Sequence, residues 1–432
     1  ESEPVFRDQL DLCFELSEAI GRGTERCVFL GDSDQDTIRL NTIAIAQSLL
    51  FMVQYATAQL LLSWGIQPRA MIGHSTGELV AACVAGVMSL EDAIVLVAAR
   101  GELMDQTPPG TMLSVKASAD ALALFLNDNL SVGAINSPED CTLSGTVEAV
   151  DAAMAALAEH GIECVRIRAD HAYHSRFMEP VLDHFEAVAA KMELRAPRIP
   201  YFSNVTGRWI TDEQATDPHY YRDHIRQTVQ FQAGLETLLE GEPPVFVEVG
   251  PGRMLTKHVR ATANQASLRC INVLRHRKED VHDAQHLAAS VGRLWEYGVA
   301  PDWKRIQGGQ PAPLLPLPLY PFAEDEYPLD IEEFQMALGD AGDRGRLRVR
   351  VPERASELAE WEWQPSVASP VDDRGRVLLV LTDQEEELRR VMADVPRWRC
   401  LWVEPGHEYA FHGFQGATIR LDDPQDWARL LD

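Results

Sequence analysis

The stretch that decides the fold is Ala-Met-Ile-Gly-His-Ser-Thr-Gly-Glu at residues 70–78, followed directly by an apolar run of small residues. An apolar strand that ends in Gly-x-Ser-x-Gly and continues into a helix-forming run is typical of a nucleophile elbow. Gly73 and Gly77 are expected to leave room for neighbouring backbone. Ser75 is therefore the candidate nucleophile, and the backbone N–H of Thr76 is expected to face a developing oxyanion.

The composition is that of an ordinary globular protein, and 432 residues are enough for two or three domains. The net charge of −27 makes nucleic acid and anionic membranes poor partners. Its 7 cysteines are scattered and contain no Cys-x-x-Cys pair, which predicts free thiols, a reducing cytoplasmic location and no zinc site. Residues 43–65 could span a bilayer by length, but three glutamines interrupt the run, so we expect a buried core helix. The first residues do not have the pattern of a signal peptide, so none is expected.

The predicted fold class is α/β, with a hydrolase-like parallel-sheet core formed by residues 1–110 and 173–305. Residues 111–172 alternate between short strands and helices in the order β-α-β-β-α-β, which predicts an inserted ferredoxin-like small subdomain. Its strands are expected at 112–115, 132–135, 141–144 and 164–167, and its helices at 118–126 and 146–160.

The remaining chain is predicted to hold a linker and a partial second α/β unit. Residues 306–345 contain a proline-dense stretch with apolar anchors, typical of an ordered extended linker. Residues 346–432 contain expected strands at 376–382 and 400–403, with a helix expected between them at 384–393.

A serine nucleophile needs a base, and the densest histidine cluster is Asp-His-Ala-Tyr-His-Ser at 170–175. His171 and His174 would need further ligands to hold a metal, and no third ligand lies nearby in the sequence. We therefore prefer His174 as the base. A serine esterase is an alternative, although that class places its histidine after the last strands and an acid before it.

Five ordered motifs resemble the malonyl/acyl-CoA:acyl carrier protein transacylase family, above all the acyltransferase domains of modular type I polyketide synthases. They are Gly-His-Ser-Thr-Gly-Glu at 73–78, Arg100, His-Ala-Tyr-His-Ser at 171–175, Ser-Asn-Val-Thr-Gly at 203–207 and Glu-Val-Gly-Pro-Gly at 248–252. With the linker motif Leu-Pro-Leu-Tyr-Pro-Phe at 317–322, the resemblance covers about 340 residues.

The resemblance implies a role for each matching residue. Ser75 corresponds to the acylated nucleophile, and His174 corresponds to its base, which a backbone carbonyl orients in this family. Arg100 corresponds to the arginine that grips the free carboxylate of a dicarboxylic unit, as a planar fork can do. Gln47 matches a glutamine near the site, with an amide on a buried helix as the alternative. Asn136 and Asn204 are expected to be structural caps of turns.

The resemblance also bears on the substrate. His171-Ala-Tyr-His is close to the His-Ala-Phe-His of members that take malonyl units, and the ring of Tyr173 would fill the space that an α-methyl group needs. The tyrosine hydroxyl and Thr76, where a larger apolar residue or glutamine is usual, are departures that leave room for an unusual extender unit. The implied substrates are a CoA thioester and a carrier-protein phosphopantetheine, with no bound cofactor or metal.

Two further features concern the ends of the chain. The family opens with an apolar strand and a Gly-Gln-Gly turn that supplies half of the oxyanion hole, and this sequence starts after that point. A catalytically incomplete structural fragment of a megasynthase is therefore an alternative to an active enzyme. Glu-Trp-Glu-Trp-Gln-Pro at 360–365 resembles the opening of a ketoreductase's structural half. Without Gly-x-Gly-x-x-Gly, no NADPH binding is expected.

The resemblance implies three partners: an acyl carrier protein and the neighbouring ketosynthase and ketoreductase domains. Residues 253–278 contain seven basic and no acidic side chains, so this stretch could receive an acidic carrier protein or the CoA phosphates. A basic helix face packed against the protein's own carboxylates is the alternative.

Overall fold

The computed structural model describes residues 3–241, 244–265, 268–276 and 278–308, and the backbone of four strands between 377 and 419. The chain divides into two compact units, Glu1–Pro318 and Leu319–Asp432, which are described separately. The predicted linker motif at 317–322, the ketoreductase-like motif at 360–365 and the helix at 384–393 lie outside the described residues. The division into domains at 110, 172, 305 and 345 stays a prediction.

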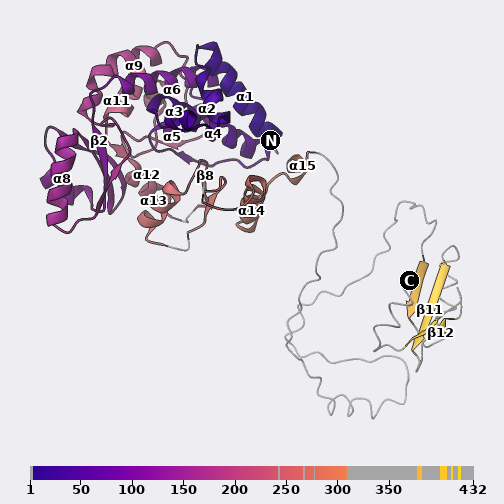
Figure 1. Cartoon of the computed structure of the whole chain (residues 1–432). Coiled ribbons are helices and arrows are strands. Elements are labelled where there is room, and N and C mark those ends of the chain that lie inside the picture. The colour runs from indigo at the N-terminus through magenta and orange to yellow at the C-terminus, as the bar shows by residue number, and fades with distance from the viewer. Residues whose placement is uncertain are drawn as a thin grey trace. The chain divides into compact units, whose positions relative to one another are not determined.

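The first unit is rich in helices, which gather around α4 (Figure 1). Its first six helices are α1 (Pro4–Ala19), α2 (Thr24–Leu30), α3 (Asp34–Leu40), α4 (Ile43–Ser63), α5 (Thr76–Val84) and α6 (Leu90–Asp105). The side chain of Ser89 caps α6 by accepting the N–H of Asp92, 3.1 Å away, and acidic residues occupy the first turn. Among the described residues, α4 is the one helix long and apolar enough to cross a bilayer, and half of its most apolar window is buried within this protein.

Outside the inserted sheet, the described residues of the first unit contain two short parallel pairs. Strand β1 (Met71–Ile72) pairs with β6 (Tyr201–Phe202), and β8 (Phe246–Glu248) pairs with β9 (Cys270–Asn272). The predicted α/β class is confirmed, with mixed sheets. The pairing of β1 with β6 matters most for function, because it brings residue 203 and its successors beside the turn that follows β1.

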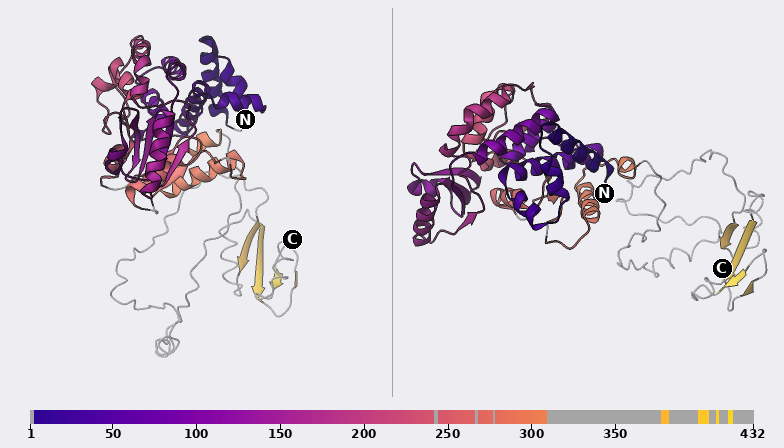
Figure 2. Two further views of the ribbon diagram at one scale, coloured as in Figure 1. Left: turned by 60° about the vertical axis from the view of Figure 1, so that its left-hand side comes forward. Right: turned by 45° about the horizontal axis from the view of Figure 1, so that its top comes forward.

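A five-stranded sheet carries the inserted β-α-β-β-α-β elements, and α8 lies against it (Figure 2). The elements are β2 (Thr111–Val115), α7 (Ala119–Leu122), the 3-10 turn η1 (Ala123–Phe125), β3 (Leu130–Ser137), β4 (Asp140–Gly145), α8 (Val147–Glu159) and β5 (Cys164–Ile167). The strand order β5-β2-β4-β3 is that of a ferredoxin-like unit. A fifth strand, β7 (Val229–Gln230), joins parallel to β3 from a remote part of the chain, which the sequence patterns did not predict.

The rest of the first unit is helical and surrounds the short parallel pairs. Its elements are η2 (Arg176–Val181), α9 (Leu182–Ala189), α10 (Asp212–Thr216), α11 (Pro218–Arg226), α12 (Phe231–Leu239), α13 (Met254–Ala263), α14 (Asp283–Glu296) and α15 (Trp303–Ile306). Helices α6, α9 and α11 lie side by side (Figure 1). Asp217 caps α11, and Pro218 occupies its first turn, where the missing N–H has no cost.

The described part of the second unit is a four-stranded sheet of order β10-β11-β13-β12. Its strands are β10 (Val377–Leu381), β11 (Arg399–Pro405), β12 (Ala410–Phe411) and β13 (Ala417–Ile419). The strands expected at 376–382 and 400–403 are present, and they pair in parallel as an α/β unit requires.

Candidate active site

Ser75 lies on a strained turn between β1 and α5, as the elbow motif predicts. Its φ of 52° and ψ of −117° belong to a conformation that side chains rarely adopt. A Cβ added to Gly73 would lie 2.1 Å from the backbone carbon of Gly77, so Gly73 is required by close packing. The same expectation for Gly77 was wrong, since a Cβ there would meet nothing within 4 Å.

His174 contacts Ser75 through its Nε2, which lies 2.8 Å from the Ser75 Oγ. Its Nδ1 lies 3.1 Å from the carbonyl oxygen of Gln227, so Nδ1 carries the proton and Nε2 is free to accept one. Burial, with smaller contributions from Arg100 and His74, lowers the pKa of His174 to about 3. The imidazole therefore stays neutral at physiological pH, in the form that a general base needs.

Arg100 reaches Ser75 from α6, and its side chain is only 1% exposed. Its Nη2 donates to the Ser75 Oγ at 2.8 Å, and its Nη1 donates to the Thr76 Oγ1 at 3.0 Å and to the Gln47 Oε1. Burial lowers the pKa of Arg100 to about 10, so it remains charged near pH 7. No carboxylate in the described part of the chain forms an ion pair with it, and its Nε has no hydrogen-bond partner there.

A buried guanidinium without a directly bonded anion is costly, because the charge of Glu78, which forms no ion pair with Arg100, offsets its desolvation only in part. Such a group is suited to an anionic ligand that arrives from solution. The structure brings Ser75, His174, Arg100, Gln47 and Thr76 together, as the sequence predicted, from β1–α5, α6, α4 and the segment after β5. Their catalytic and binding roles stay predictions.

His171 and Tyr173 lie to one side of this group. The His171 Nδ1 is 3.0 Å from the Thr107 Oγ1 and 3.3 Å from the carbonyl oxygen of Pro108, both just beyond α6. The Tyr173 ring centroid is 6.1 Å from that of His171, and Tyr173 packs against the main core. Neither side chain bonds to Ser75 or Arg100. Either one could contact a substrate only if the substrate extended from Ser75 toward it.

Asn204 is the residue whose role sequence reasoning missed. Its Oδ1 accepts the N–H of Ser75 at 2.7 Å, and its Nδ2 donates to the carbonyl of Gly73 at 2.7 Å. Asn204 therefore clamps both sides of the elbow, which is more than the turn cap expected for it. The available signal was an asparagine directly after a strand, in the Ser-Asn-Val-Thr-Gly motif. Asn136 likewise bonds to a neighbour of the nucleophile, because its Oδ1 lies 2.8 Å from the His74 Nε2.

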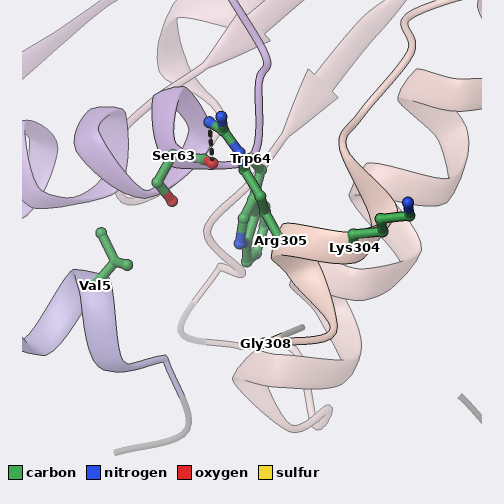
Figure 3. A pocket seen from close by; sticks show the side chains of 6 residues that line it. All are labelled: Val5, Ser63, Trp64, Lys304, Arg305 and Gly308. Atoms are coloured by element: carbon green, nitrogen blue, oxygen red, sulfur yellow. Dashed lines mark hydrogen bonds between the residues drawn. The ribbon is translucent and has the colours of Figure 1, made fainter. Parts of the chain in front are cut away.

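A surface pocket beside α15 is separate from this group of residues. It is lined by Val5, Ser63, Trp64, Lys304, Arg305 and Gly308 (Figure 3). Arg305 donates to the carbonyl of Ser63 at 3.4 Å, and none of the lining residues bonds to Ser75, His174 or Arg100. Across the described ranges, no group of three His, Cys, Asp or Glu side chains is placed to hold a metal ion.

The strained serine, the neutral histidine and the buried arginine lie together in one polar site, and the comparison with known proteins gives the family of the chain. The chain belongs to the acyl transferase domain family, which matches residues 1–301. It is 35% identical over 329 residues to a phenolphthiocerol/phthiocerol polyketide synthase of Mycobacterium tuberculosis, in a match that covers 76% of this chain and 22% of that protein. It is also 35% identical over 331 residues to the spectinabilin polyketide synthase system protein NorB of Streptomyces orinoci, covering 75% of this chain and 15% of that one. The chain thus spans less than a quarter of these relatives.

Solved structures agree with this assignment. The acyl transferase domain of ZmaA matches with a TM-score of 0.68 and 34% identity over 73% of this chain and 74% of that one. The acyl transferase domain of SpnD, in complex with 2-(pent-4-yn-1-yl)malonyl, matches with a TM-score of 0.64 and 40% identity over 68% and 71%. The predicted resemblance to polyketide synthase acyltransferase domains is confirmed, and the ketoreductase-like start of the second unit remains a prediction.

Proposed function

We propose that this domain transfers a malonyl-type unit from CoA to the phosphopantetheine thiol of an acyl carrier protein, through an ester on Ser75. One observation carries the proposal: the buried guanidinium of Arg100 has no carboxylate partner among the described residues and lies within hydrogen-bond reach of the nucleophile. A substrate with a free carboxylate next to its thioester would supply that partner, and the planar fork could bind it with two hydrogen bonds.

In the first half-reaction, the Ser75 Oγ attacks the thioester carbonyl while the His174 Nε2 accepts the serine proton. The C–S bond then breaks, His174 gives this proton to the sulfur, and CoA leaves as a thiol. In the second half-reaction, the phosphopantetheine thiol gives its proton to His174 and attacks the serine ester. Ser75 leaves with that proton, and the acyl group ends on the carrier thiol.

The N–H of Thr76 would stabilise the negative oxygen that forms in both steps. It is the first N–H of α5, and no acceptor for it is present among residues 3–241 or the later described segments. A free N–H at a helix N-terminus is suited to an oxyanion, and the loss of such a donor costs about 3 kcal/mol of transition-state stabilisation.

The substrate carboxylate would also tune the base. The positive charge of Arg100 is the second cause of the low pKa of His174, after burial. A bound carboxylate would offset this charge and raise the pKa of His174, which makes it a stronger base only when the correct substrate is present.

The proposed partners are an acyl carrier protein and the ketosynthase and ketoreductase domains of the same synthase, in the cytoplasm. The relatives' names as polyketide synthases support this context. The free thiols of the six described cysteines fit a reducing compartment.

Labelling tests the reaction directly. The protein is incubated with malonyl-CoA that carries a radioactive malonyl group, digested, and the labelled peptide is sequenced. We expect label on the peptide that contains Ser75, loss of label in Ser75→Ala, and transfer of label to an added carrier protein. Unchanged labelling of Ser75→Ala, or label on another peptide, would refute the proposal. Hydrolysis of neutral aryl esters that is unaffected by Arg100→Ala would favour an esterase instead.

For selectivity, we propose that malonyl-CoA is preferred over methylmalonyl-CoA because the Tyr173 ring occupies the space of an α-methyl group. A methyl group in a pocket changes binding by about 1–3 kcal/mol, so misloading should be measurable. A competition between the two esters should load mostly malonyl groups, and Tyr173→Ser should raise the methylmalonyl share. A wild-type protein that loads mostly methylmalonyl groups would contradict this.

A further inference from the structure

Glu78 is a buried carboxylate that the proposed mechanism does not use. It lies on α5, three residues after Ser75, and is 2% exposed. No Lys or Arg of the described ranges pairs with it. Its Oε2 accepts the backbone N–H of Asn204 at 2.6 Å, and its Oε1 accepts the hydroxyl of Tyr220 at 2.5 Å. The Nε2 of His224 lies 3.5 Å from Oε2.

One side of this carboxylate leads to the nucleophile. Asn204, held by Glu78 through its backbone, uses its side chain to bind the N–H of Ser75 and the carbonyl of Gly73. The φ of 52° at Ser75 is a strained conformation that persists only when neighbouring contacts hold it. Glu78 therefore fixes the residue that holds the elbow in its strained form.

The other side of Glu78 leads to the base. Tyr220 and His224 both belong to α11, which ends at Arg226. The next residue, Gln227, provides the carbonyl that accepts the Nδ1–H of His174. The His224 ring also lies 6.3 Å from the His174 ring, centroid to centroid. A shift of α11 relative to α5 would thus move the acceptor that orients the imidazole.

We propose that Glu78 is a positioning residue. It fixes the position of the nucleophile elbow relative to α11, the helix that directly precedes the carbonyl acceptor of His174. This inference rests on the proposed acyl transfer. Burial raises the pKa of Glu78 to about 7, and the hydrogen bonds from Tyr220 and Asn204 oppose that shift, so keeping the carboxylate here costs stability. This carboxylate bonds to Asn204, which holds the elbow, and to Tyr220 of α11, the helix that precedes the acceptor of His174, and through them it acts on the geometry of the catalytic pair.

Two neighbouring tyrosines provide a matched test. Tyr220→Phe removes the hydroxyl that binds Glu78, whereas Tyr221→Phe removes an equally buried hydroxyl of α11 that donates to the carbonyl of Ala215 at 3.0 Å. Single-turnover acylation by radiolabelled malonyl-CoA is measured over a range of concentrations, with urea unfolding in parallel. Tyr220→Phe should lower the maximal acylation rate about tenfold without changing the half-saturating concentration, because a small misplacement of reacting groups slows chemistry. Tyr221→Phe should stay within about twofold of wild type.

Glu78→Gln should have a larger effect, about 30-fold or more, because an amide cannot accept both hydrogen bonds. Glu25→Gln, which changes another carboxylate that is only 1% exposed, is its control and should leave the rate unchanged. If Glu78→Gln does not fold, the tyrosine pair decides alone. Equal maximal rates for the two tyrosine variants would overturn the inference. So would a change in the half-saturating concentration of malonyl-CoA alone. A wild-type protein without any acyl-serine would instead refute the proposed function.

Discussion

The polar site around Ser75 and the apolar core of the β2–β5 sheet both contain deeply buried side chains, yet they are built from opposite chemistry. Leu113, Val115 and Leu143 are fully buried in the sheet core, where removal from water stabilises the fold. In the site, Arg100 and His174 are buried with displaced pKa values. The comparison teaches that the sheet core stabilises the fold, whereas the buried polar groups of the site lower stability in exchange for reactivity.

The largest effect should come from the base. His174→Ala is expected to slow acylation of Ser75 by about a factor of 10³, because general bases contribute about 10² to 10⁴. Single-turnover labelling with malonyl-CoA measures it. The free energy of unfolding should fall less than in a sheet-core variant, since a buried imidazole with a lowered pKa is not a source of stability. A loss of stability as large as that of the sheet-core variant would remove the contrast between the two regions.

Leu143→Ala should show the opposite pattern. Removing a fully buried leucine typically costs about 2–5 kcal/mol, from lost burial and the cavity left behind. Urea unfolding should reveal this loss, while the acylation rate per folded molecule stays within about twofold of wild type. If Leu143→Ala acylates more slowly than wild type while both proteins are fully folded, the sheet core also positions the site.

A smaller effect concerns the pH dependence of stability. The folded pKa of His174, about 3, lies below its ordinary value of 6.5, so between these values the unfolded chain binds a proton that the folded chain does not. Proton uptake by this group in the unfolded chain therefore lowers the free energy of unfolding as pH falls below 6.5, by about 2 kcal/mol at pH 5. Glu78 opposes this, because its pKa is raised to about 7 and protonation below that value favours the folded state.

Urea unfolding at pH 7 and pH 5 can separate the two groups. His174→Ala should lose less stability on acidification than wild type, and Glu78→Gln should lose more. His184→Ala, which changes an exposed histidine, is the control and should follow wild type. Identical pH dependence in all four proteins would show that neither buried group titrates differently in the folded state.

The smallest effect concerns the basic stretch after the Gly-Pro-Gly turn. Arg253 pairs with Glu279, and Arg275 pairs with Asp283, which supports the structural alternative for these two. Lys257 is exposed on α13 and is the better test. Lys257→Glu should raise the carrier protein's KM a few-fold at low salt and leave hydrolysis of the acyl-serine unchanged. An unchanged KM at low salt would assign Lys257 a structural role as well.

Local sequence patterns predicted much of the fold. The strand at 164–167 has the predicted bounds, and α8 lies within the helix predicted at 146–160. Thr146 caps it, and its hydroxyl accepts the N–H of Ala149 at 3.2 Å. The elbow at 70–78 has the predicted strand, turn and helix. Each of these features depends on interactions between residues a few positions apart, which periodicity and capping rules describe.

Local patterns did not predict the pairings between segments that are far apart in the sequence. Strand β7 is only two residues long and has no pattern of its own, so its addition to the inserted sheet could not be foreseen. The clamp by Asn204 depends on the pairing of β1 with β6, which lies outside any local window. The expectation for Gly77 failed for a related reason, because the direction of a missing Cβ follows from the turn's actual geometry.

By itself, the sequence determined that Ser75 lies on an elbow, and the family motifs singled out Arg100 and His174 as its companions. Only the tertiary structure decided that the carbonyl of Gln227 orients His174 and that Tyr220 binds Glu78, 142 positions away. The physical reason is that every residue carries a carbonyl, so its use leaves no mark in the sequence. A buried carboxylate likewise acquires its partners only when the helices that surround it pack together.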